Sequence, residues 1–498
     1  MARPAQVAED PTPLDGDRID VGSRIGWLLR ESRLSAGVSL GSMRTGLGAF
    51  GLELAPSSLS RIERGHWRRG DVLDGYEVVL GLEPGRLRGA VDVLSRTFPY
   101  GPADDEVRPT GREALDSYDA AVESVRRPEP SGADWLAFAR SHDPGTEFGL
   151  PTADLEPLVE RLTSELARSV GTAFCTRYEA LARLRWGTYG HLVAEAGLRF
   201  LSDPGVQLVA DVAGCISERA NPTLVRWAAG RLDHPDGMSM RAAATVLENV
   251  ANGGMLPTSD WREVPALFVE AYRKACRRHD HETRARLDAL YSALPRSIHE
   301  PIRRGLDERP RSVRSPAGWS RVRSNRHFVI ASALSERVAG DRGQPVLTRM
   351  LFEMLYDFRP ARSLNAALMV AASPHAGAAA EVLADVAAHH PDDLTRSGAA
   401  GALSSVLRSE TRVDVVPWLG DDDLKVTALI VAGMTGARIP PRLVEPQLSD
   451  PQTARWVVWY AGMARPDKVS SWVRRPGLES DVRTAAAWWR RHGARVVR

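Results

Sequence analysis

Apolar residues recur along most of this chain at intervals of three and four positions. In the first hundred residues, Ile25, Leu28 and Leu29 open such a series and Leu34 continues it. This spacing places apolar side chains on one face of an α-helix, whereas a half-buried strand would alternate them. Beyond residue 134 nearly every segment has the helical period, and no run of β-branched residues alternates strictly. The pattern therefore predicts an all-α protein.

Glycine, proline and serine divide the first hundred residues into five predicted helices. Gly37 ends the first, Ser39 caps the second, and Pro56 sits in the first turn of the third, where a helix accepts proline. We expect Gly46 and Gly48, with the glycine at 51, to loosen the chain between the second and third helices. The predicted spans are about 23–37, 39–47, 56–64, 73–80 and 84–95.

The last hundred residues repeat with a period of roughly 30 residues, which is typical of solenoids. Similar segments start at Leu394, Leu424, Pro451 and Val482. Each has an acidic residue just upstream and then small and apolar residues at helical spacing, and segments from Met240 and Ser363 look alike. One such unit cannot bury its own apolar face, so neighbouring units must stack. We expect a HEAT-like α-solenoid, with an irregular helical bundle as the alternative.

A chain of 498 residues is too long for one ordinary core, so several domains are expected. The segment 98–133 is rich in proline and glycine and reads as a linker with one helix around Arg112 to Val125. The predicted units are a disordered N-terminus (1–21), a five-helix domain (22–97), the linker (98–133), a helical domain (134–310) and a helical-repeat domain (311–498).

Charge and composition restrict the class of protein. The 65 basic residues nearly cancel the 63 acidic ones, so a nucleic-acid surface must be a local patch. The three cysteines form no CxxC pair, which argues against a zinc site and a disulfide framework. The acidic, proline-containing start is no signal peptide, and the most apolar stretch, 366–388, is broken by charges. We expect a cytoplasmic protein that does not contact membranes.

The segment SSLSRIERG, residues 57–65, carries the strongest functional signal. At helical spacing, Ser57, Ser58 and Arg61 share one side of a short helix, and Leu59 and Ile62 share another. A helix that presents serine and arginine outward and anchors itself with two aliphatic residues suits the major groove of DNA.

The order of these helices resembles the Xre/Cro/C1-type helix-turn-helix family over residues 22–95. The most specific matches are Ser57, Leu59, Ser60, Ile62, Glu63 and Gly65. The resemblance implies that the start and middle of the third helix read bases, through Ser57, Ser58 and above all Arg61, because arginine can donate two hydrogen bonds to guanine. It also implies an ion pair between Arg33 and Glu63 that fixes the first helix against the end of the third.

Further basic residues follow the motif and could hold phosphates: Arg64, Arg68 and Arg69. Trp67, between them, is either a core anchor or a plate against the sugar backbone. The chain departs from the family in the second helix, where Met43 and Arg44 replace the usual Leu-Ala and the polar residue that often holds a phosphate at the helix start is replaced near Leu40. Ser39 and Arg44 are the substitutes for that helix's phosphate contacts. The loop before the third helix is also longer by about five residues and includes Phe50 and Leu52, which could meet a partner.

Signatures of other functions are weak. No phosphate loop, dinucleotide fingerprint, nucleophile elbow or HExxH motif occurs, so we expect neither an enzyme nor a bound cofactor. His279 and His281 lack the spacing to share a metal on one helix face. Cys276 and His279 could converge, but no fourth ligand is apparent, so no metal is expected. The arginine-rich segment 296–326 is a second nucleic-acid contact, a hinge, or a solvated loop whose arginines pair with neighbouring helices, and we favour the loop.

These observations predict a sequence-specific DNA-binding transcriptional regulator. Its partner would be double-stranded DNA, bound as a homodimer on a two-fold site. The helical C-terminal part would dimerise the protein, sense a small molecule or peptide, or dock a protein. The alternative is an α-solenoid scaffold in which the N-terminal domain contacts protein or regulates the chain itself. The outward face of the third helix separates the two, because an apolar face would favour protein.

Overall fold

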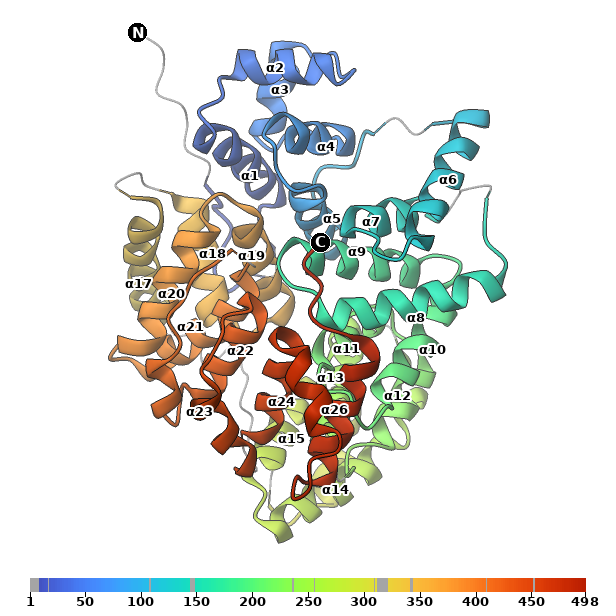
Figure 1. Ribbon diagram of the computed structural model, residues 1–498, viewed down its shortest axis with the longest axis vertical. Helices are drawn as coiled ribbons and strands as arrows, with labels where there is room; N and C mark the ends of the chain where they lie inside the picture. The colour runs from blue at the N-terminus through green and yellow to red at the C-terminus, as the bar shows by residue number, and fades with distance from the viewer. Residues whose placement is uncertain are drawn as a thin grey trace.

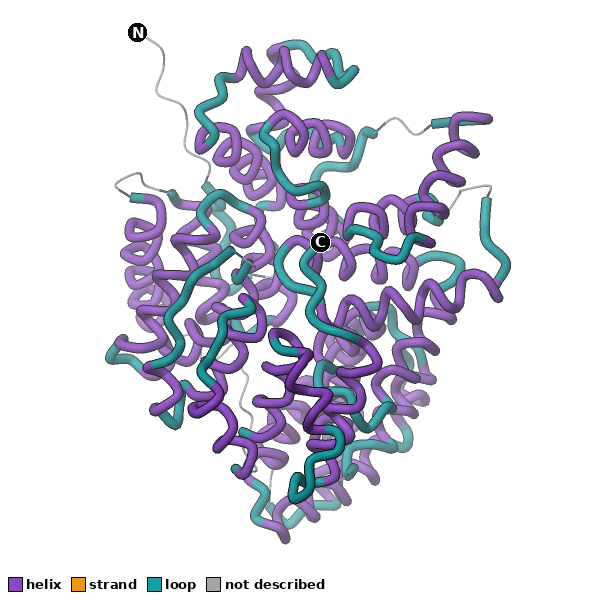
Figure 2. The backbone as a smooth tube through the Cα atoms, in the orientation of Figure 1, coloured by secondary structure: helices purple, strands orange, loops and turns teal. Residues whose placement is uncertain are grey.

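The computed structural model describes residues 9–16, 18–106, 109–143, 148–234, 237–254, 256–308, 310, 321–340, 344–408, 410–450 and 453–498. Within these ranges every regular element is helical (Figure 2), and extended backbone pairs only at the isolated bridges Arg68–Asp104 and Ser169–Val496. The predicted all-α class is confirmed. None of the helices in the described part of the chain has both the length and the apolar character to cross a bilayer.

The five predicted N-terminal helices are all present: α1 (Val21–Ser35), α2 (Leu40–Ala49), α3 (Pro56–Glu63), α4 (Gly70–Val79) and α5 (Arg86–Thr97). The expectation that Gly46 and Gly48 loosen the chain is wrong, because both lie inside α2. A Cβ atom on Gly46 would lie 2.8 Å from a methyl group of Val79, so this glycine lets α2 approach α4 closely. Leu34 does not continue the buried face of α1, since it is 41% exposed.

Residues 98–133 fold against the helices on both sides of them. The predicted helix is α6 (Gly111–Arg126), and α7 (Gly132–Arg140) follows it. The Asp104 carboxylate accepts a hydrogen bond from the backbone N–H of Gly70 at 2.9 Å, and Glu106 pairs with Arg88 at 2.6 Å. The start of this segment is therefore fastened to α4 and α5 and is not a free linker.

The next helices form a two-layered array (Figure 1). Its elements are α8 (Thr152–Arg168), α9 (Thr172–Trp186), α10 (Gly190–Leu201), α11 (Ala210–Ser217), α12 (Pro222–Ala229), α13 (Gly237–Gly253), η1 (Thr258–Trp261), α14 (Val264–Arg278), α15 (His281–Ala293) and α16 (Arg296–Arg304). The helices α9, α11, α13 and α15 stack in one layer, and α8, α10, α12, α14 and α16 stack in the other. This is the arrangement of a solenoid built from helix pairs.

A second array follows. Its elements are α17 (Arg321–Ala339), α18 (Pro345–Tyr356), α19 (Pro360–Ala372), α20 (Ala376–His389), α21 (Asp393–Val406), η3 (Pro417–Gly420), α22 (Lys425–Thr435), α23 (Pro441–Val444), η4 (Glu445–Ser449), α24 (Ala454–Ala464), α25 (Pro466–Trp472) and α26 (Ser480–His492). The four predicted repeats coincide with α21, α22, α24 and α26, which stack in that order. The short helices η3, η4 and α25 each lie against the long helix of the same repeat.

The arginine-rich segment 296–326 is not a solvated loop at its start. Residues 296–304 form α16, in which Arg303 and Arg304 both pair with Glu300 of their own helix. The predicted pairing with neighbouring helices is therefore wrong for these two arginines. The middle of the segment, 311–320, lies outside the described residues.

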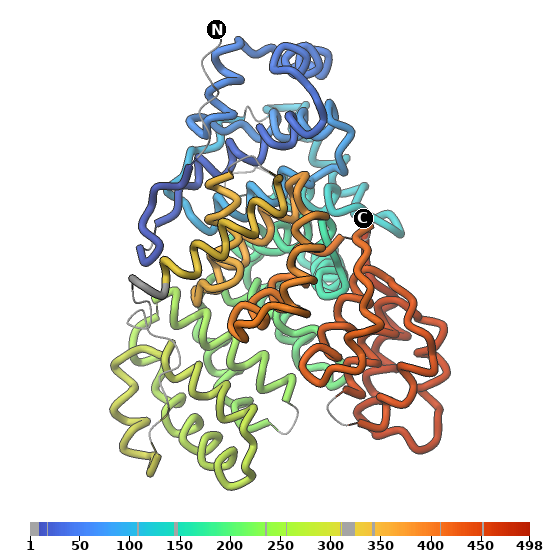
Figure 3. The backbone as a smooth tube through the Cα atoms, turned by 90° about the vertical axis from the view of Figure 1, so that its left-hand side faces the viewer, coloured from blue at the N-terminus to red at the C-terminus, as the bar shows by residue number. Residues whose placement is uncertain are grey.

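The end of the chain joins the second array back to the first. The backbone of Val496 exchanges hydrogen bonds with Arg168 at 2.8 Å and Val170 at 3.0 Å, at the junction of α8 and α9. The indole N–H of Trp489 donates to Gln207 at 2.7 Å. The two arrays therefore meet here as well as beside the N-terminal helices (Figures 1 and 3).

The five-helix domain is docked firmly on both arrays. Helix α1 packs on α18 and α19, and α5 lies against α9 and α19. Arg24 on α1 is completely buried, and its guanidinium pairs with Glu353 of α18 at 2.7 Å and with Asp10 at 2.9 Å. Trp27, also on α1, donates to Gln344 at 2.9 Å.

The N-terminal segment takes part in this docking. Asp10 is buried against Arg24, and Arg349 donates to the carbonyl oxygens of Thr12 and Pro13 at 2.7 and 3.1 Å. The expected disordered N-terminus, 1–21, is thus ordered from residue 9 to residue 16, because arginines of the second array hold its backbone. Residues 1–8 lie outside the described part of the chain.

Acid should loosen this docking. Burial raises the pKa of Asp10 and Glu353, but Arg24 outweighs it, so both lie below their ordinary values of 3.8 and 4.5. Their contribution to stability is full at neutral pH and is lost as pH falls below about 4. We expect Glu353→Gln to reduce the drop in urea midpoint between pH 6 and pH 3.5, and Glu113→Gln, an exposed carboxyl on α6, to leave it unchanged. Equal drops in the Glu353→Gln variant and the parent would contradict this account.

Candidate nucleic-acid interface

Helix α3 presents a polar face to solvent and an apolar face to the domain core. Leu59 and Ile62 are fully buried, whereas Ser57 and Arg61 are exposed and Ser58 is half-buried. Pro56 occupies the first turn, where a backbone N–H would have no acceptor within the helix, so the missing N–H of proline costs no helical hydrogen bond. The three predicted base-facing residues therefore share a solvent-accessible side of one short helix, as their spacing required.

The predicted ion pair between Arg33 and Glu63 is confirmed. The Arg33 guanidinium binds both carboxylate oxygens, with Nε–Oε1 at 2.5 Å and Nη2–Oε2 at 2.7 Å. The Tyr76 hydroxyl on α4 donates to the same carboxylate at 2.8 Å, and Arg33 also donates to the carbonyl oxygen of Val38 at 2.8 Å. The hydrogen bonds from Arg33 to Glu63 raise the pKa of Arg33. One carboxylate thus ties α1 and α4 to the end of α3.

Three glycines bring α1 and the end of α3 into backbone contact. Gly65 has a φ of +74°, and a Cβ atom there would lie 1.9 Å from the carbonyl oxygen of Gly22. On Gly26, one turn along α1, a Cβ atom would lie 2.7 Å from the Glu63 carbonyl oxygen. Sequence reasoning did not assign Gly22 and Gly26, although two glycines four residues apart share one helix face. The three glycines allow the backbones of α1 and the end of α3 to pack in direct contact, and this contact restricts the angle between the two helices.

Three of the predicted phosphate contacts lie at the surface. Arg64 follows α3 and Arg44 lies on α2, which packs against α3; both are exposed. Neither forms an ion pair with the residues that the structure describes. Ser39 is exposed and caps α2, because its Oγ accepts a hydrogen bond from the Ser42 N–H at 3.0 Å. These side chains are placed as a phosphate contact requires.

Arg68 is not available for DNA, and its assignment as a phosphate contact is wrong. Its side chain is buried and pairs with Asp92 of α5 at 2.5 Å and with Asp104 at 3.4 Å. Arg69 is intermediate: it is partly exposed, but its guanidinium binds Asp71 through two hydrogen bonds. A phosphate would have to displace that carboxylate. Only the tertiary structure distinguishes these two arginines from Arg64.

The Trp67 ring lies close to the guanidinium groups of Arg61 and Arg69. The guanidinium carbons of Arg61 and Arg69 lie 6.0 and 5.7 Å from the Trp67 ring centroid, within the range of cation–π attraction. The indole N–H donates to Asp105, which fixes the ring. Trp67 is half-buried and is thus a platform that restricts where the Arg61 side chain can reach.

The loop between α2 and α3 is shorter than predicted. It comprises residues 50–55, because α2 continues to Ala49. Phe50 is 48% exposed, whereas Leu52 is half-buried. Of the two residues that could meet a partner, only Phe50 presents a large apolar surface.

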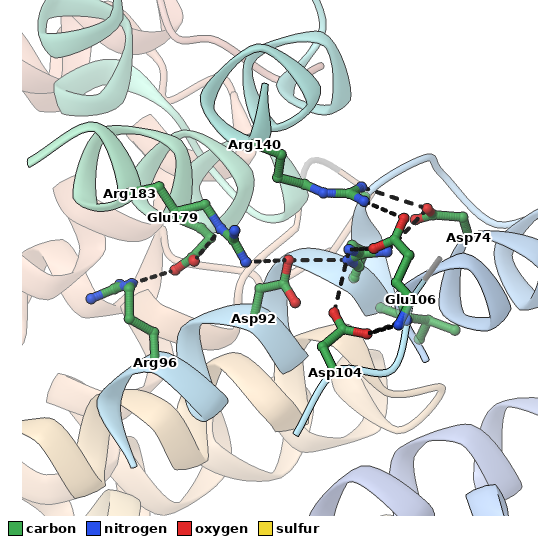
Figure 4. A network of polar contacts seen from close by, with 12 residues as sticks. Asp74, Asp92, Arg96, Asp104, Glu106, Arg140, Glu179 and Arg183 are labelled. Atoms are coloured by element: carbon green, nitrogen blue, oxygen red, sulfur yellow. Dashed lines mark hydrogen bonds and ion pairs between the residues drawn. The ribbon is translucent and has the colours of Figure 1, made fainter. Parts of the chain in front are cut away.

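A buried network of charges joins this interface to the rest of the chain (Figure 4). Asp92 on α5 accepts from Arg88 of its own helix at 3.0 Å, from Arg68 at 2.5 Å and from Arg183 of α9 at 3.2 Å. Burial raises the pKa of Asp92, but these arginines outweigh it and hold that pKa well below its usual range. Glu179 of α9 extends the network to Arg96 at 2.9 Å. The helices that support α3 are therefore tied electrostatically to the first array.

Within the described residues, no group of three or more histidine, cysteine and acidic side chains is arranged to hold a metal ion. Cys276 and His279 end α14, and His281 begins α15. Cys175 and Cys215 are buried thiols, and burial raises the pKa of both. A buried thiol with a raised pKa is a weak nucleophile, which applies to Cys175 and Cys215.

Comparisons with known proteins give little guidance. No family model matches the sequence, and no curated protein matches it. Two solved structures align over most of the chain. One is an engineered protein from the Northeast Structural Genomics Consortium, with 16% identity, 77% of this chain and 96% of the other covered, and a TM-score of 0.22. The other is from work on tubulin recruitment and assembly by microtubule polymerases with Tumor Overexpressed Gene (TOG) domain arrays, with 8% identity, coverages of 78% and 99%, and a TM-score of 0.22.

The glycine contact between α1 and α3 can be tested with a matched pair of variants. Gly65→Ala adds a methyl group at positive φ against the Gly22 backbone, so we expect a loss of several kcal/mol in the free energy of unfolding. Gly37 has a φ of +68° with nothing within 4 Å of its Cβ position, so Gly37→Ala should cost only about 1–2 kcal/mol. Denaturant melts of both variants check this, and similar losses would remove the close contact from the argument.

Proposed function

We propose that this protein is a sequence-specific DNA-binding transcriptional regulator that reads the major groove with α3. The observation that carries the proposal is the outward face of α3. It bears Ser57, Ser58 and Arg61, with Arg64 at its end, and no large apolar side chain. An apolar face would have favoured a protein partner and the scaffold alternative.

The dimensions of α3 suit this role. An eight-residue helix is about 12 Å long, which is comparable to the width of the major groove. Arg61 can donate two hydrogen bonds to the O6 and N7 atoms of guanine, and the serines can add shorter contacts to base edges. Arg64 and Arg44 would meet the phosphates and set the register of the helix.

The charge distribution supports a local interface. The whole chain carries a formal net charge of only +2, so it has no general affinity for polyanions on that ground. Arg44 on α2, Arg61 on α3 and Arg64 at its end are nevertheless all exposed, and the helices α2, α3 and α4 project from the body (Figure 1). One such domain makes few base contacts, so selection among genomic sites calls for a homodimer on a two-fold operator.

Base reading by Arg61 is tested by selection from a library of random duplexes. With the full-length Arg61→Ala protein, we expect the guanine preference at one position of each half-site to disappear, at a cost of about 1–3 kcal/mol for the best site. The matched control is Arg304→Ala, an exposed arginine on α16 whose side chain is 78% exposed. An unchanged preference in the Arg61→Ala protein would refute this assignment.

Arg64 and Arg68 are expected to behave oppositely. Arg64→Ala should weaken binding to all sequences alike and reduce the salt slope by about one, with the melting temperature unchanged. Arg68→Ala removes one of the cations around the buried Asp92, so it should destabilise the fold by up to about 3–5 kcal/mol. Titrations at several salt concentrations and denaturant melts measure both. A stable Arg68→Ala protein with a reduced salt slope would reverse the two roles.

A further inference from the structure

A cavity lies where the five-helix domain meets the first array. It is bounded by α5, α6, α7 and α9 and by Asp104, Glu106, Pro109 and Thr110, and its volume is about 1070 Å³. Sites for small organic ligands typically have volumes of roughly 300–1,000 Å³ and often lie between domains. Among the residues on its walls, Arg68 is the one for which the sequence predicted a contact, and that contact was a DNA phosphate.

One wall of the cavity is rich in hydrogen-bond donors. Its arginines are Arg68, Arg88, Arg96, Arg140 and Arg183. The described lining also includes five carboxylates, and each of them already has partners. Asp92 accepts from three arginines, Glu106 accepts from Arg88 and Arg140, Asp104 lies beside Arg68 and Arg88, Asp143 pairs with Arg183, and Asp134 accepts from the Ser131 N–H. The polar atoms on this wall that remain without a partner among the described residues are two guanidinium nitrogens and one hydroxyl, and all three can donate a hydrogen bond.

Three polar atoms on this wall have no hydrogen-bond partner among the described residues. They are Nε of Arg68, Nη2 of Arg96 and Oγ of Ser95, and all three are buried. Arg68 is only 7% exposed. A buried donor without a partner costs free energy, so an acceptor that reached this wall would recover it.

The wall formed by α6 combines apolar and hydroxyl side chains. Ala114, Tyr118 and Ala121 line the cavity there together with Ser117 and Ser124, and Phe148 lines it too. Trp186 at the end of α9 also lines it and is 43% exposed, which is unusual for so large an apolar side chain. This wall can cover an aromatic ring or an aliphatic chain.

We propose that this cavity binds a small organic anion. Its acidic or acceptor-rich end would lie against the arginine wall, and its apolar body would lie against α6. The walls come from both sides of a junction: Arg68, Arg88 and Arg96 belong to the five-helix domain, and Arg140 and Arg183 belong to α7 and α9 (Figure 4). Occupancy therefore bears on how the domain that carries α3 is held. This last step, unlike ligand binding itself, rests on the proposed function.

The probe for the test is 1-anilinonaphthalene-8-sulfonate, an aromatic anion whose fluorescence rises in apolar surroundings. The full-length protein should bind it at one saturable site, and the uncharged analogue N-phenyl-1-naphthylamine should bind at least ten-fold more weakly. Equal affinity for the two probes would contradict the arginine wall as the anchor.

Variants locate the site. Ala114→Trp fills the cavity from α6 and should weaken probe binding at least ten-fold, and Leu115→Trp is the matched control, because Leu115 is 40% exposed and does not line the cavity. Ser117 lines the cavity and is exposed, so Ser117→Trp repeats the test if Ala114→Trp fails to fold. Unchanged probe affinity in a folded variant of either kind would overturn the proposal.

Ser95→Ala separates binding from folding. The Ser95 hydroxyl has no hydrogen-bond partner among the described residues, so its removal should leave the melting temperature unchanged or slightly higher, while probe affinity falls about five-fold. Unaltered affinity would remove this hydroxyl from the site and contradict the donor wall.

A second arm addresses regulation. Affinity for a selected operator duplex is measured with and without saturating probe, and we expect a change of at least five-fold. An unchanged affinity contradicts the regulatory step but leaves the binding site intact, because the probe is titrated without DNA. Loss of DNA binding altogether, with probe binding retained, would count against the proposed function alone.

Discussion

The fold depends on a buried negative charge at the centre of α5. Asp92 is completely enclosed, and an isolated carboxylate in such a place would be prohibitively unstable. It is neutralised by arginines from three parts of the chain: Arg88 on the same helix, Arg68 after α3, and Arg183 on α9. Because the three must converge, the position of α5 is fixed relative to both α3 and the first array. A second buried cluster, around Arg24, fixes α1 relative to the second array.

These two clusters fix the orientation of the N-terminal domain on the two arrays. A helix-turn-helix reader on a flexible linker could rotate freely, and its helical partner would act only by dimerising it. Here α1 and α5 are packed into the body, so the direction of α3 is set by the arrays. Any event that shifts α9 or α19 would be transmitted to α3 through packed helices and ion pairs. In a homodimer, such a shift would alter the separation of the two α3 helices. Affinity for a two-fold operator would then change, because its half-site spacing must match that separation.

The sequence predicted the local helices better than it predicted how the N-terminal domain packs on the two arrays. The five N-terminal helices and the four C-terminal repeats follow from helical spacing, whereas the Arg33–Glu63 pair was implied by the resemblance of residues 22–95 to a helix-turn-helix family. The Arg24–Glu353 pair joins residues 329 positions apart, and no local pattern reports it. Likewise, Arg64 and Arg68 are equivalent in a run of basic residues, yet one is exposed and the other is enclosed by α5 and residue 104. Of the four helices around the cavity, α5 and α6 were predicted near their observed positions, but no local pattern shows how the four assemble.

The measurement that tests the central claim most directly is genome-wide mapping of the sites occupied by the full-length protein in cells. If α3 reads operators as part of a homodimer, the bound fragments should share a short motif with two-fold symmetry and a guanine at a fixed position in each half. Occupancy spread evenly over the genome, or no recoverable DNA, would contradict it.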